Sequence, residues 1–329
     1  MDWGTGCGET REKATKVRQL KPSKGLIATA MNDNIEISDA TGGGPNIKNV
    51  SETALWVAYY RAIESSRRDA LFYDPYARVL AGERGKEIAR TIPYGKNSAW
   101  SMAVRTCLLD EIILRLIKDD KVDTVLNLGA GLDTRPYRLP LPASFNWIEV
   151  DLPGILEYKE KKLAGVQPVC DLKSAKMNLA DTQSARSLFR EVNERNEKVL
   201  ILSEGLLAWL SRDDVANLAK SLHEQTGFTW WLMDIMTAAL SQWLAQVGWN
   251  KATDAGNAKM QFAPEEGPAF FVPFGWDVAE KLSMGQEARR LHREMSLAWL
   301  WRLLAPLAPK DKREMYQQLD SYIVLLTRS

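Results

Sequence analysis

The spacing of hydrophobic and polar positions changes near residue 121. Before it, apolar side chains recur at helical spacing, which predicts three helices, from residue 51, from residue 77 and over 99–118. Beyond it, short apolar runs alternate with helical patterns, which is typical of a sheet whose strands are joined by helices. The predicted strands are 122–128, 145–150, 166–170, 198–202, 228–233, 276–282 and 321–327. The pattern therefore predicts an α/β fold.

Acidic or polar residues follow the first five predicted strands. They are Asp133, Asp151, Asp171, Ser203 with Glu204, and Asp234. One aspartate in such a place is more often a helix cap or a turn residue. Ligands of open parallel sheets bind outside the carboxyl ends of the strands, so five such positions in succession favour a ligand site.

The first predicted strand runs directly into a glycine turn, Gly129-Ala130-Gly131. Two glycines permit a tight turn and a close approach of the ligand, but Thr134 stands where a dinucleotide fingerprint has its third glycine. The turn therefore fits a nucleoside ligand without a diphosphate, of which S-adenosylmethionine is the commonest. Asp151 follows Gly129 by 22 residues, an offset at which a carboxylate can accept both ribose hydroxyls. Nicotinamide enzymes share that aspartate, so an oxidoreductase remains an alternative.

Composition and net charge argue against several classes of function. The chain has 329 residues and a formal net charge of +1, so no overall field would attract nucleic acid or an anionic membrane. No apolar run approaches the roughly 20 residues of a membrane helix, and we expect a soluble, cytoplasmic protein. Three isolated cysteines indicate reduced thiols. The only histidines, His223 and His292, are interpreted as structural or solvated, which argues against a histidine-dependent triad or metal site.

Residue composition and hydrophobic pattern divide the chain into three regions. Residues 1–50 are polar and rich in glycine, and we expect a mobile tail; a segment that orders over a ligand is the alternative. Residues 51–121 form a helical region before the sheet, which could roof the ligand crevice. Residues 122–329 form the core, with an insertion at about 236–275.

Two features of the last hundred residues have open interpretations. Trp243, Phe270 and Phe271, in the insertion, either line an acceptor pocket or belong to the core. Residues 286–304 predict a basic amphipathic helix, whose arginine cluster is interpreted as a solvated face; its members are Arg289, Arg290 and Arg293.

Seven motifs in order resemble the leucine carboxyl methyltransferase family, which includes bacterial S-adenosylmethionine-dependent methyltransferases and polyketide O-methyltransferases. They lie at residues 53–62, 74–77, 104–106 with 110 and 111, 128–135, 149–153, 171–172 and 203–210. The resemblance covers residues 51 to about 235. It implies a class I, Rossmann-like methyltransferase with a seven-stranded, mostly parallel sheet and one antiparallel strand, a helical lid at the N-terminal side and an insertion after strand five.

The resemblance also implies roles for individual residues around S-adenosylmethionine. Arg105 matches the arginine that holds the methionyl carboxylate. Asp151, next to Leu152, would take the ribose, and Glu204 would lie near the cofactor's amino-acid end. The implied cofactor-binding set is Arg105, Gly129, Gly131, Asp133, Asp151, Leu152, Asp171, Leu172 and Glu204. In this set Asp171 and Leu172 match the pair that holds adenine.

The implied reaction is transfer of a methyl group from sulfonium to an oxygen atom of a small molecule. Because histidine is scarce, an acceptor that needs no general base is favoured, either a carboxylate or an acidic hydroxyl. Trp209 lies in a segment where the protein-phosphatase enzymes of the family carry a tyrosine, which argues against a protein C-terminal leucine as the acceptor. A protein that binds the cofactor without turnover is a further alternative.

Overall fold

The structure is a computed structural model that describes residues 50–91, 95–249, 260–295 and 318–329, together with positions 298, 300, 304 and 309. Nearly all of the expected N-terminal tail, and most of the predicted helix beyond residue 295, lie outside these residues. No helix in the described part of the chain is long and apolar enough to cross a membrane.

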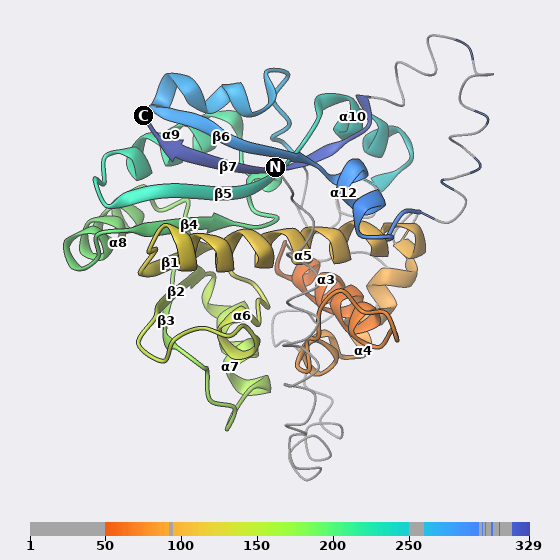
Figure 1. The fold of residues 1–329 in the computed structure, drawn as a ribbon, viewed down its shortest axis with the longest axis horizontal. Coiled ribbons are helices and arrows are strands. Elements are labelled where there is room, and N and C mark those ends of the chain that lie inside the picture. The colour runs from red at the N-terminus through yellow and green to blue at the C-terminus, as the bar shows by residue number, and fades with distance from the viewer. Residues whose placement is uncertain are drawn as a thin grey trace.

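Seven strands form one sheet in the order β3-β2-β1-β4-β5-β7-β6 (Figure 1). The strands are β1 (Thr124–Leu128), β2 (Asn146–Asp151), β3 (Asp171–Lys176), β4 (Val199–Ser203), β5 (Phe228–Met236), β6 (Trp276–Ser283) and β7 (Ser321–Arg328). Strand β7 lies antiparallel between β5 and β6, while the other neighbouring pairs are parallel. The mostly parallel sheet with one antiparallel strand is therefore confirmed.

Helices cover both faces of this sheet. Those before β1 are α3 (Val50–Ser65), α4 (Ala77–Thr91) and α5 (Gly95–Asp119), and those after it are α6 (Arg135–Arg138), α7 (Pro153–Lys162), α8 (Thr182–Arg195), α9 (Arg212–His223), α10 (Ala238–Gln246) and α12 (Met284–Arg290). Figure 1 shows α5 lying along the sheet. Side chains of α5 and α12 pack on one face, and those of α8 and α9 pack on the other. The alternation along each strand divides the core: Leu200 faces α5, whereas Ile201 faces α9.

The prediction of the third strand is wrong. Residues 166–170 are not a strand; β3 spans Asp171–Lys176 at the edge of the sheet, where only Leu172 and Ala175 are half-buried and the other four residues are exposed. An edge strand is held mainly by its backbone bonds to one neighbour, here β2, so it needs no apolar run. The choice of the most apolar segment therefore placed the strand five residues too early.

The segment between β5 and β6 contains α10 and a 3₁₀ helix, η3 (Gly267–Phe274), with residues 250–259 outside the described part. Phe270 and Phe271 are buried in the core, where Phe271 packs edge-on against Trp231 with ring centroids 5.1 Å apart. The pocket interpretation of these two phenylalanines is therefore wrong. Trp243 is half-buried on α10.

Candidate functional site

The glycine turn after β1 is built for close approach. Gly129 and Gly131 have φ angles of 69° and 50°, a region that favours glycine. The amides of Gly129 and Ala130 both donate to the Val150 carbonyl, at 2.8 and 3.2 Å, which fixes the turn against β2. A Cβ atom added to Gly129 would lie 3.0 Å from Leu206 Cδ1. The glycines therefore leave room that any side chain would fill.

Asp151 closes one end of the turn. Its Oδ2 accepts the Gly131 amide at 2.7 Å, and its Oδ1 accepts the amide of Leu152, also at 2.7 Å. Burial raises the pKa of this carboxyl, and the two amide hydrogen bonds oppose that rise. Each carboxylate oxygen still has a lone pair to offer, so Asp151 can accept hydroxyl groups from a ligand at the turn.

Arg105 and Glu204 lie at the other end of the site. Arg105 Nε donates to Glu204 Oε1 at 2.9 Å, and Arg105 Nη1 donates to Asp234 Oδ2 at 3.0 Å. The second oxygen of Asp234 accepts the Gly205 amide at 2.6 Å. Helix α5 and the carboxyl ends of β4 and β5 are thus joined by one guanidinium group.

A buried arginine lies behind this pair. Arg135, whose side chain is 2% exposed, donates to Glu204 Oε2 at 2.7 Å, to Asp133 Oδ2 at 3.0 Å and to Asp110 Oδ1 at 2.7 Å. Burial alone would raise the pKa of Asp133, but Arg135, Lys159 and Arg138 together outweigh it and lower the pKa to about 2. Likewise, Arg135 and Arg105 hold the pKa of buried Glu204 below its usual value. Both carboxylates are therefore ionised at neutral pH.

One cavity contains most of the predicted site. Its lining includes Arg105, Gly129, Gly131, Asp133, Asp151, Leu152 and Glu204. Helix α3 contributes Ala54, Val57 and Arg61 to the same lining. Carboxylates and an arginine thus occur in one cavity with a glycine turn between them, which suits an elongated, zwitterionic nucleoside ligand.

Asp171 and Leu172 do not lie in this cavity. In the register of β2 and β3, Asp171 lies beside Asn146, at the start of β2, whereas Asp151 lies beside Lys176. Five residues of strand separate the two ends by about 16 Å. Asp171 is exposed and forms an ion pair with Lys173 at 3.0 Å. The resemblance implied that both residues hold adenine, whereas the structure places them outside the cavity, at the start of β3.

Sequence reasoning did not assign several residues that the structure brings to the site. Arg61 donates to the carbonyl oxygen of Leu132, in the turn, at 2.5 Å and to Asp74 at 2.9 Å, and Thr134 also donates to Asp74, at 2.7 Å. Helix α3 is thereby tied to the glycine turn. A charged residue within an apolar helical stretch was the signal available for Arg61.

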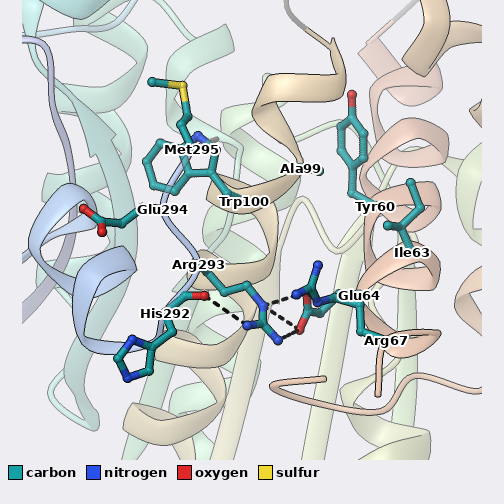
Figure 2. Close-up of a pocket in the computed structure, with 10 residues that line it drawn as sticks. All are labelled: Tyr60, Ile63, Glu64, Arg67, Ala99, Trp100, His292, Arg293, Glu294 and Met295. Atoms are coloured by element: carbon teal, nitrogen blue, oxygen red, sulfur yellow. Dashed lines mark hydrogen bonds and ion pairs between the residues drawn. The ribbon is translucent and has the colours of Figure 1, made fainter. Parts of the chain in front are cut away.

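A second cavity, of about 210 Å³, lies between α3, α5 and residues 292–295 (Figure 2). Arg293 runs beneath it and donates to both oxygens of Glu64, at 2.9–3.1 Å, and to Asp69. Arg293 is 7% exposed. The prediction of a solvated arginine face is therefore wrong for Arg293, because α12 ends at Arg290 and the chain turns inward at His292, where φ is 53°.

Neither histidine lies in the first cavity. His223 packs edge-on against Trp276, with ring centroids 5.7 Å apart, and His292 is exposed. Within the described residues, no group of histidine, cysteine, aspartate and glutamate side chains is arranged to hold a metal ion.

Comparison with known proteins agrees with this geometry. The family model of leucine carboxyl methyltransferases matches residues 54–223. A "Putative S-adenosyl-L-methionine-dependent methyltransferase" of Saccharopolyspora erythraea is 33% identical over 186 residues, which cover 54% of this chain and 64% of the relative. A similarly named protein of Frankia alni is 32% identical over 227 residues, covering 64% of this chain and 77% of the relative. The chain thus spans less than two thirds of the first relative.

Solved structures agree on the fold. A DUF574 family protein of Streptomyces avermitilis superposes with a TM-score of 0.55 at 15% identity, over 84% of this chain and 97% of that one. A "putative methyltransferase" of Thermobifida fusca gives 0.51 at 16% identity, over 86% and 95%. The family model covers more than half of the sequence, and the chain belongs to the leucine carboxyl methyltransferase family.

Proposed function

We propose that this chain is an S-adenosylmethionine-dependent O-methyltransferase that acts on a carboxylate, or on an acidic hydroxyl, of a small organic or polyketide-like molecule. The observation that carries this proposal is one cavity with two polar ends. Asp151 is at the ribose end, while Arg105 and Glu204 are at the amino-acid end. The relatives' names and the family membership support the same cofactor.

The residues present fit this cofactor. Gly129 and Gly131 leave space beside the turn, and Asp151 offers its lone pairs to the ribose hydroxyls. The guanidinium fork of Arg105 suits the methionyl carboxylate, and Glu204 suits the ammonium group. When bound, the cofactor supplies an activated methyl group, so the chain's own contribution is orientation and exclusion of water.

Because Asp171 and Leu172 lie outside the cavity, other residues would have to bind adenine. We assign it to Asn178 and Leu179, which follow the carboxyl end of β3. The amide of neighbouring Met177 donates to the Asp151 carbonyl at 2.8 Å, so this segment is anchored next to the ribose position. An amide side chain can pair with the edge of adenine, and a leucine can contact its face.

The choice of acceptor rests on the lack of a histidine base among the described residues that line the cavity. A carboxylate is ionised at neutral pH and attacks without losing a proton, whereas an alcohol needs a base in the site. Neither histidine lines the cofactor cavity in the described part of the chain. The net charge of +1 supports a small acceptor over nucleic acid, and we propose a cytoplasmic enzyme whose helices α3–α5 roof the site.

Calorimetric titration of the purified chain tests the cofactor. We expect S-adenosylhomocysteine to bind and NADH not to bind; the reverse result would identify a nicotinamide-dependent oxidoreductase instead. Asp151→Ala should weaken S-adenosylhomocysteine at least tenfold, since a charge-assisted contact is lost. Asp171→Ala is the matched control, because Asp171 lies at the start of β3, at the opposite end of the strands from Asp151, and it should leave the affinity unchanged.

Transfer of a radiolabelled methyl group to a panel of acids and phenols tests the reaction. Product label that is released by alkali indicates an ester, and hence a carboxylate acceptor; alkali-stable label indicates an ether. Cofactor binding without transfer to any acceptor would favour a non-catalytic binding protein. Labelling of a protein C-terminal carboxylate would restore the alternative that Trp209 argues against.

A further inference from the structure

Asp234 belongs to the group of charged side chains at the amino-acid end of the site, where it contacts Arg105. It lies at the carboxyl end of β5, directly beside Glu204, since Ser203 pairs with Met233 in the register of β4 and β5. Its two oxygens are both in use, one on the Gly205 amide and one on Arg105. Two carboxylates on adjacent strands therefore share one guanidinium group. Family resemblance assigned no role to Asp234.

The charges in this network do not balance. Hydrogen bonds link three guanidinium groups to four carboxylates, namely Arg105, Arg135 and Arg138 to Asp110, Asp133, Glu204 and Asp234. Among the described residues that these bonds join, one negative charge is left over. Asp110 is the one carboxylate of this set that Arg138 contacts, and Arg135 is shared by three carboxylates. We therefore place the uncompensated negative charge at the end of the network where Asp234 and Glu204 share Arg105.

Methyl transfer changes the net charge of the ligand. An oxygen lone pair of the acceptor forms the new C–O bond, and the electrons of the C–S bond return to sulfur, so that the sulfonium cation becomes a neutral thioether. The donor carries a net charge of +1 with its sulfonium, ammonium and carboxylate groups, while the product S-adenosylhomocysteine carries none. A surplus negative charge thus interacts more favourably with the donor than with the product.

We propose that Asp234 supplies the surplus negative charge by which this site favours the sulfonium form of the cofactor over the thioether product. This inference rests on the proposed function. It makes Asp234 a specificity residue for the state of the cofactor, in addition to its part in orienting Arg105. A residue that only orients Arg105 would affect donor and product alike, because both carry the same carboxylate.

The test compares two dissociation constants measured by calorimetry, for S-adenosylmethionine and S-adenosylhomocysteine. Asp234→Asn keeps the shape of the side chain and an acceptor for the Gly205 amide but removes the charge. We expect it to raise the constant for the donor more than that for the product, by a factor of roughly ten, the size of one charge interaction in a partly buried site. Asp234→Glu, which keeps the charge, should keep the ratio of the two constants close to that of the wild type.

The control is Asp277→Asn, which removes the same charge from an exposed position at the start of β6 and should leave both constants unchanged. If Asp234→Asn does not fold, Asp234→Ser removes the charge and leaves space for water at the Gly205 amide. Equal changes in both constants, or no change in either, would overturn the proposal. Failure of the wild-type chain to bind either ligand would instead overturn the proposed function.

Discussion

Arg105 Nε and Glu204 Oε1 are joined by a 2.9 Å hydrogen bond across 99 residues of sequence. Burial lowers the pKa of Arg105, but the adjacent Asp234 and Glu204 outweigh it and raise the pKa. The pair is therefore a fixed dipole at one end of the cavity, with the cation and the anion needed for an α-amino acid. Gly205 lies against the guanidinium group: a Cβ there would be 3.4 Å from Arg105 Nη1.

Arg105→Lys should weaken binding of the amino-acid end of the ligand but not of its nucleoside end. A lysine keeps the charge but loses the planar fork, so we expect the affinity for S-adenosylhomocysteine to fall by about tenfold or more. Affinity for 5′-methylthioadenosine, which lacks the amino-acid group, should hardly change. Calorimetric titration of both ligands measures this difference. An equal loss for the two ligands would contradict the placement of Arg105 at the amino-acid end.

Much of this site was predictable because its residues follow the central strands. Strands β1 and β4 are fully buried and mostly apolar, so their ends, and with them Gly129 and Glu204, are readily located in the sequence. Strand β3 has no such signal, since Asp171–Lys176 pairs on one side only and holds mostly polar residues. The sequence pattern therefore did not show that Asp171 and Leu172, which the resemblance matched to adenine, stand at the start of this strand.

The other wrong predictions concern residues whose environment depends on contacts that are distant in the sequence. Phe270 and Phe271 form an aromatic pattern that suits a pocket as well as a core, and only their packing with Trp231 and Trp276 distinguishes the two. Arg293 follows two other arginines, and only the turn at His292 directs it inward to Glu64.

Gly129→Ala should affect both stability and binding. The positive φ angle costs a residue with a Cβ about 1–2 kcal/mol, and contact with Leu206 at 3.0 Å adds to that cost. We expect a lower free energy of unfolding in urea and weaker S-adenosylhomocysteine binding. Gly154→Ala is the control: no atom lies within 4 Å of its added Cβ, so stability should stay the same or rise by up to about 1 kcal/mol. Wild-type behaviour of Gly129→Ala would contradict the tight turn.

The raised pKa of Glu149 predicts that the free energy of unfolding depends on pH. Burial raises its pKa to about 7, although Lys159, whose Nζ donates to it at 2.5 Å, opposes the rise. The folded pKa is above the unfolded value of 4.5, so this contribution to stability is complete below pH 4.5 and is lost as the pH rises through 7. The loss is about 3 kcal/mol at most.

The measurement is the free energy of unfolding in urea at intervals from pH 4.5 to 8, for the wild type and for Glu149→Gln. The variant cannot ionise at this position, so its stability should fall less over that window. Exposed Glu191→Gln should retain the wild-type profile. Parallel profiles for the wild type and Glu149→Gln would show that Glu149 does not titrate in this range.

Arg293→Ala should be strongly destabilising although it changes a residue in an arginine-rich surface segment. Its loss leaves Glu64, whose side chain is 5% exposed, without its principal cation, and breaking a buried ion pair in this way costs about 3–5 kcal/mol. Arg289→Ala, four residues earlier and 62% exposed, should change stability by less than about 0.5 kcal/mol. Urea denaturation measures both. Combining Arg293→Met with Glu64→Gln should recover part of the loss, because neither side chain then carries an unpaired buried charge; equal effects of the two alanine variants would contradict the buried placement of Arg293.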